Sequence, residues 1–192
     1  MSTVVASALP TRVDLATWDE DVSGRDDAYE LVEGVPTMTP AESLRNRAAG
    51  TLLAGALNAA REGWIAVIDA ELTISEVLGT VRRPDVVVVR SALARDRAGQ
   101  PEHRLPAREV LFVAEVVSPS SVERDLVTKR REYALAGIPS YLIVDLRYEP
   151  GELTLYADRD GAGLFVNVEP ALRVDILVAG RTIPVTVADL LG

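Results

Sequence analysis

Residues 110–145 have the sequence VLFVAEVVSPSSVERDLVTKRREYALAGIPSYLIVD, which indicates a strand, a helix and a second strand. The apolar run at 110–117 predicts a buried strand. The SPSS turn at 118–121 can cap a helix over about residues 122–136, which a glycine then ends. Residues 141–145 predict a short buried strand. This unit is typical of a sheet with a helix packed against it.

The segments before this unit supply a helix and further strands. Apolar side chains recur on one face over residues 43–62, which predicts a helix. Residues 64–75 and 81–90 predict two strands, and the VVVV run in the second indicates burial on both faces. Residues 95–108 predict a surface loop. The order helix, three strands, helix, strand predicts an α/β fold with a mixed central sheet, in which ligand sites lie at strand ends.

Extra strands are expected at both ends of this core. Residues 29–38 predict an N-terminal hairpin with Gly34 at its turn, and the chain before it has one short amphipathic piece at 13–22. From residue 152, short strands alternate with glycine and proline, before a short helix at about 187–191. The sequence therefore predicts a core that is extended by β-structure on both sides.

Length and composition indicate a globular protein. The 192 residues fit one domain, 1–192, with its core at about 29–145 and a C-terminal β extension at 150–192. The absence of cysteine excludes disulfides and thiolate metal sites. The one histidine, His103, lies in a polar stretch and is interpreted as a solvated loop residue. No apolar run approaches the ~18 residues of a membrane span, and no secretory signal is recognisable, so we expect a cytoplasmic protein with no membrane partner.

The net charge of −9 argues against a protein that coats nucleic acid, because neutralisation of phosphates dominates such binding. It does not exclude a nuclease, because a bound divalent cation reverses the local sign of the carboxylates that hold it. The arginines crowd the middle of the chain, where a solvated face is the simplest interpretation: Arg82, Arg83, Arg90, Arg95, Arg97, Arg104, Arg108, Arg124, Arg130 and Arg131.

Lys129 is the only lysine in the chain, and all nineteen other basic residues are arginine. An ammonium is a compact point charge whose pKa a crowded polar site can tune, and arginine does not replace it there. The alternative is a surface lysine retained by chance. Asp125, Lys129 and Tyr133 recur every four residues and share one helical face. An ordinary surface ion pair is the competing interpretation of that spacing.

Two acids interrupt apolar runs before Lys129. Asp85 opens the run PDVVVV, and Glu115 lies within the run LFVAEVV. A buried carboxylate must be hydrated, paired or bound to metal, and two neighbouring ones repel each other unless a cation lies between them. Mg²⁺, or Mn²⁺ in its place, suits a site with only oxygen ligands. Two acids and a lysine at one edge of a sheet would make a metal-dependent phosphodiesterase site. In such a site Lys129 would hold or help to deprotonate the water that attacks the phosphate, or stabilise the charge that grows on the phosphate.

Five segments in order resemble the Uma-type family of restriction endonucleases, within the PD-(D/E)xK nuclease superfamily. They are YELVEG (29–34), RRPDVVVV (82–89), AEVVSPSS (114–121), the pattern DxxxKxxxY (125–133) and AGIPSYLIVD (136–145). The resemblance implies a restriction-endonuclease-like αβββαβ core. It also implies that the lysine comes from the helix after the acidic strand, as Lys129, and not from two residues after the acid, where Val117 stands.

The resemblance assigns site residues as well. It implies that Asp85 and Glu115 are metal ligands, and that Glu30, beside Tyr29, completes the acidic cluster. Three residues of the matching segments have supporting roles: Tyr133, Asp125 and Ser118. The chain departs from the family at the start of the first long helix. Family members often carry a histidine there, and Asn46, flanked by arginines, takes its place here.

The leading hypothesis is an Mg²⁺-dependent endonuclease that acts on DNA. The first alternative is a nuclease fold that does not cut and serves as a binding or regulatory module. The second is a metal-dependent hydrolase of another phosphodiester. A site filled by internal salt bridges with no room for water would favour the binding module. A homodimer is expected, because duplex cleavage needs two active sites and the C-terminal strands offer edges for pairing.

Overall fold

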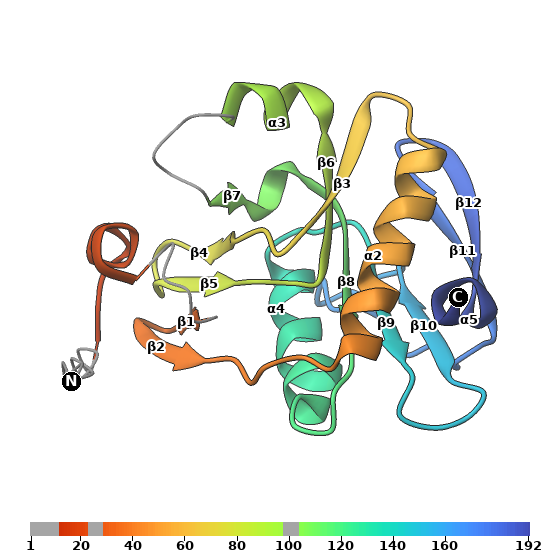
Figure 1. Cartoon of the computed structure of the whole chain (residues 1–192). Coiled ribbons are helices and arrows are strands. Elements are labelled where there is room, and N and C mark those ends of the chain that lie inside the picture. Colours follow the sequence, from red (N-terminus) through yellow and green to blue (C-terminus); the bar gives the residue numbers. More distant parts are fainter. Residues whose placement is uncertain (1–11, 23–28, 98–103) are drawn as a thin grey trace, which may run out of the picture.

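The structure, a computed structural model, describes residues 12–22, 29–97 and 104–192. A five-stranded sheet with the strand order β10–β9–β8–β6–β3 carries most of its core (Figure 1). Strands β8 and β9 run parallel, and the other neighbours run antiparallel. The mixed α/β fold is therefore confirmed. The strands of this central sheet are β3 (Trp64–Ile68), β6 (Val86–Arg90), β8 (Val110–Val116), β9 (Tyr141–Asp145) and β10 (Glu152–Tyr156).

Both faces of the central sheet are covered. Val86 and Val88 belong to one buried cluster, and Val87 and Val89 belong to another on the opposite face. All four valines are at most 1% exposed, so the VVVV run is buried on both faces, as successive residues of a strand point to opposite sides.

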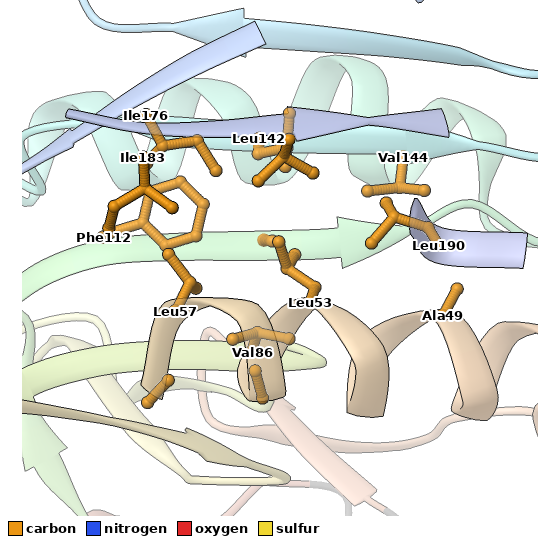
Figure 2. Close-up of a cluster of buried hydrophobic side chains, with 14 of the residues drawn as sticks. Ala49, Leu53, Leu57, Val86, Phe112, Leu142, Val144, Ile176, Ile183 and Leu190 are labelled. Atoms are coloured by element: carbon orange, nitrogen blue, oxygen red, sulfur yellow. The ribbon is translucent and has the colours of Figure 1, made fainter. Parts of the chain in front are cut away.

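Helix α2 (Leu44–Ala59) covers the first face. Its side chains Leu53 and Leu57 pack against Phe112 and Leu142 of the sheet (Figure 2). The side chain of Ser43 caps the helix by accepting a hydrogen bond from a backbone N–H of the first turn. The C-terminal hairpin of β11 (Arg173–Val178) and β12 (Arg181–Thr186), followed by α5 (Val187–Leu191), adds apolar side chains to the same cluster.

The helix between β8 and β9 packs on the second face. It begins as a π-helical segment, η3 (Arg124–Lys129), and continues as α4 (Arg130–Leu135). Its Tyr133 is fully buried and lies edge-to-face against Tyr141 of β9, with the ring centroids 5.0 Å apart. The helix predicted over 122–136 is present, but its first turns are wider than those of an α-helix.

A second sheet has the strand order β2–β1–β5–β4–β7. The predictions of continuous strands at 64–75 and 81–90 are wrong, because each segment passes from one sheet to the other. Asp69, with a φ of 54°, separates β3 from β4, and Pro84, which has no N–H to donate, lies between β5 and β6. The strands of this sheet are β1 (Tyr29–Val32), β2 (Val35–Met38), β4 (Leu72–Ser75), β5 (Thr80–Arg82) and β7 (Leu105–Pro106).

The predicted loop at 95–108 is partly regular. Helix α3 (Ser91–Arg97) enters it, and β7 and the short 3₁₀ helix η2 (Ala107–Glu109) follow. His103 lies outside the described residues. The amphipathic piece at 13–22 forms α1 (Leu15–Thr17) and the π-helical η1 (Trp18–Val22). None of the helices in the described ranges has the length and apolar character that crossing a bilayer requires.

Candidate active site

Lys129 ends η3 with its ammonium buried among carboxylates. The side chain is 3% exposed, and Nζ lies 2.7 Å from Glu115 Oε1, 3.0 Å from Glu30 Oε1 and 3.7 Å from Asp125 Oδ1. The interpretation of Asp125 and Lys129 as a surface ion pair is therefore wrong. Burial disfavours the charged amine, but Glu115, Glu30 and Asp125 outweigh burial and raise the pKa of Lys129. The side chain accordingly stays protonated at neutral pH.

Glu115 points from β8 toward that helix. Its Oε1 accepts hydrogen bonds from Lys129 Nζ and from the Tyr133 hydroxyl, both at 2.7 Å. Burial raises the pKa of Glu115 to about 7, although Lys129 opposes the shift. Any further positive charge placed beside such a carboxyl group would lower its pKa and favour its ionised form.

Asp85 lies in the break between β5 and β6, next to the end of β8. The antiparallel pairing of Val86 with Ala114 brings Asp85 beside Glu115. Asp85 Oδ2 accepts a hydrogen bond of 2.5 Å from the Val116 N–H. Burial, the charge of Glu115 and contact with Glu42 together raise the pKa of Asp85 to about 10. The two acids that the sequence singled out therefore crowd each other.

A polar pocket of about 270 Å³ opens beside these groups. Five of the predicted site residues line it: Asp85, Glu115, Ser118, Asp125 and Lys129. Asp125 Oδ1 is buried and has no hydrogen-bond partner among the described residues. The site thus combines internal ion pairs with space in which water or a ligand can be held.

Glu30 and Tyr133 are not among the lining residues, and they position the others. Glu30 Oε1 accepts from Lys129 Nζ at 3.0 Å and from the Arg83 N–H at 3.1 Å, and its Oε2 accepts from Arg82 Nη1 at 2.9 Å. Burial opposes ionisation of Glu30, but Lys129 and Arg82 outweigh it and lower its pKa. Glu30 thus lies beside Lys129 but outside the lining of the pocket, and its carboxylate holds the ammonium in place.

Ser118 shapes the turn after β8. Its N–H donates to Ser121 Oγ at 3.0 Å, and the Ser121 N–H donates to its carbonyl at 3.1 Å. The turn leads into η3, the helical segment that carries Asp125 and Lys129, and so helps to position both side chains.

Two neighbours of the site have contacts that the sequence did not predict. Asn46 Nδ2 donates to the carbonyls of Val116 and Val117 at 3.3 Å each, and so holds the end of β8 against α2. Glu42, just before α2, faces Asp85 in the pocket. The departure from the family pattern at Asn46 marked the first position, whereas nothing in the sequence pattern marked Glu42.

The residues present fit a divalent cation. The donors that Asp85 and Glu115 offer are oxygens, and burial raises the pKa of both groups, so a cation beside them would favour their ionised forms. Within the described ranges, no three His, Cys, Asp or Glu side chains are grouped as a metal site. Mg²⁺ commonly binds through one or two carboxylates and completes its shell with water and substrate, so a two-carboxylate site suits it.

The fold is that of a restriction-endonuclease-like protein. The family model described as "putative restriction endonuclease", Uma2, matches residues 13–187, and the chain belongs to this family. A crystal structure described as a "putative nuclease belonging to DUF820" from Anabaena variabilis superposes with a TM-score of 0.65 at 14% identity, over 87% of this chain and 91% of that one. A comparison with curated proteins gave no match.

Proposed function

We propose that the protein is an Mg²⁺- or Mn²⁺-dependent endonuclease that hydrolyses phosphodiester bonds of DNA. The observation that carries the proposal is the buried ammonium of Lys129, 2.7 Å from Glu115 on the wall of a pocket that Glu115 shares with Asp85. Membership of a restriction-endonuclease family and the nuclease-like fold support a nucleic acid substrate.

Each polar group has a role that follows from its contacts. Asp85 and Glu115 would hold the cation, which polarises a phosphoryl oxygen and lowers the pKa of bound water when present. Because Lys129 remains protonated, it acts as a fixed positive charge toward the phosphate and not as a general base. Glu30 keeps that charge in place, and Tyr133 orients the Glu115 carboxylate.

Plasmid cleavage tests this assignment. Supercoiled DNA is incubated with Mg²⁺, Mn²⁺ or chelator and with the wild type, Glu115→Gln, Lys129→Met or Asp175→Asn. Asp175 is 56% exposed on β11, so its variant controls for the loss of a carboxylate. We expect the first two variants to lose about 100-fold or more in rate and the control to match the wild type. Full activity in both site variants would show that the cleavage has another source.

A non-cleaving binding module is the second candidate function. The internal ion pair of Glu115 with Lys129, which already occupies one carboxylate oxygen, favours it. In that case the wild type would bind DNA but leave it intact with either metal. Hydrolysis of a small phosphodiester without any cleavage of DNA would instead indicate a different phosphodiester substrate.

We also propose that the protein forms a homodimer, because cutting both strands of a duplex requires two such sites. We propose the cytoplasm as the place where it acts. Sedimentation analysis at high protein concentration tests the first part. A species of twice the chain mass supports the dimer, and a monomer at every concentration contradicts it.

A further inference from the structure

Three arginines from separate elements line the pocket that Asp85 and Glu115 share. Arg47 comes from α2, Arg83 from the connection between β5 and β6, and Arg124 from the start of η3. The fold therefore brings three guanidinium groups, far apart in the sequence, to the site where the proposed chemistry takes place.

These guanidinium groups have no carboxylate at hydrogen-bonding distance among the described residues. Arg83 Nε donates to the backbone carbonyl of Asp69 at 3.3 Å. Arg124 Nε is buried without a hydrogen-bond partner, and its nearest carboxylate oxygen, on Asp125, is 3.9 Å away. Arg47 is exposed at the pocket. All three guanidinium groups can therefore bind an external anion.

Several other arginines of the chain are paired closely with acids. Arg82 Nε lies 2.7 Å from Glu132, and Arg147 Nη2 lies 2.6 Å from Asp145. Such pairs consume the hydrogen-bonding fork that suits carboxylate and phosphate alike. By contrast, no carboxylate occupies the forks of the three pocket arginines among the described residues.

The charge of the pocket also differs from that of the whole chain. Five acidic and four basic side chains line it, so it is nearly neutral although the chain carries −9. Local charge, and not net charge, determines where an anion can approach. This pocket is therefore a place where a polyanion can approach the strongly acidic protein.

We propose that Arg47, Arg83 and Arg124 form a phosphate clamp. The clamp holds the backbone of a nucleic acid strand on both sides of the phosphodiester bond that is hydrolysed beside Asp85 and Glu115. The inference rests on the proposed function for the identity of the anion. The three guanidinium groups come from separate elements, and that of Arg47 is exposed. This arrangement suits a chain of phosphates that extends beyond the pocket. Contacts to phosphate fix the position of the strand but carry no base sequence.

Binding of a fluorescent DNA duplex in Ca²⁺ buffer tests the clamp. Anisotropy titrations at several salt concentrations compare the wild type with Arg47→Ala, Arg83→Ala and Arg124→Ala. The matched control is Arg61→Ala, which removes an exposed charge beyond the C-terminal end of α2. We expect each clamp variant to bind about tenfold more weakly on two unrelated sequences, and to lower the slope of log affinity against log salt by about 0.9.

The control should bind as the wild type does. Arg→Lys at each clamp position should retain the salt slope while losing part of the affinity, because the charge stays and the fork is lost. Clamp variants that bind like Arg61→Ala, or a wild type that does not bind DNA at all, would overturn the proposal.

Cleavage assays on the same proteins separate the two proposals. If binding depends on the three arginines but the wild type never cuts, the nuclease assignment fails and the clamp stands. If the wild type cuts and the arginine variants bind and cut equally well, the clamp fails and the nuclease assignment stands.

Discussion

Replacing Lys129 with methionine removes the positive charge that Glu115, Glu30 and Asp125 surround. Methionine has a similar length and is apolar, so the main change is electrostatic. In the wild type, two carboxylate oxygens lie 2.7 and 3.0 Å from Nζ, and none of the three acids is more than 5% exposed. The variant leaves these carboxylates buried without their shared cation.

The size of the effect follows from burial. Removing one partner of a buried ion pair costs about 3–5 kcal/mol, whereas an exposed pair contributes about 0–1 kcal/mol. Total stabilities are about 5–15 kcal/mol, so the variant should lose a large share of its free energy of unfolding. Arg173→Met is the control, because Arg173 is 62% exposed and pairs with Asp175 at 3.1 Å.

Urea unfolding followed by circular dichroism measures both free energies. The double variant Lys129→Met/Glu115→Gln should recover part of the loss, because it also removes one of the unpaired charges. If Lys129→Met costs no more than Arg173→Met, the ammonium is not buried between Glu115 and Glu30, and the reasoning fails.

Three further predictions concern other residues of the candidate site. Asn46→Ala leaves the Val116 carbonyl without its amide donor and should cost about 1–3 kcal/mol in urea unfolding; an unchanged midpoint would contradict the role given to Asn46. Tyr133→Phe removes the hydroxyl bonded to Glu115, and should cost about 1.5–3 kcal/mol at a pH where that carboxylate is charged, with little change after Glu115→Gln. In chelator, the folded chain keeps the Asp85 proton up to a pKa of about 10, whereas the unfolded chain releases it near 3.8. Its contribution to stability is therefore lost as the pH rises between these values; thermal unfolding should show this decline, and Asp85→Asn should flatten it.

Much of the fold follows from periodicity. The four valines of β6 are buried on both faces, and the helix after β8 leads to a buried strand, β9, as the pattern indicates. The breaks at Asp69 and Pro84 were missed because an alternating apolar pattern continues when a strand leaves one sheet for another. Pro84 gave a local signal, but the apolar run VVVV at 86–89, which follows it, obscured that signal.

The proximity of Lys129 to Glu115 was within reach of the sequence, because one turn and one helical segment separate them. Arg82 was not, and its assignment to a solvated face is wrong, because it is 1% exposed and bonded to Glu30 and Glu132. Those partners are 52 and 50 residues away in the chain. Only the packing of β1, β5 and α4 brings them together, and no local pattern reports that packing.

Calorimetric titration with Mn²⁺ at neutral pH tests the central claim most directly, which is that Asp85 and Glu115 together hold a divalent cation. The wild type should bind Mn²⁺ saturably and release protons on binding, because both pKa values are raised in the free protein. Asp85→Asn and Glu115→Gln should each bind at least about tenfold more weakly, while Asp175→Asn binds normally. Equal Mn²⁺ affinity in all four proteins would contradict the claim.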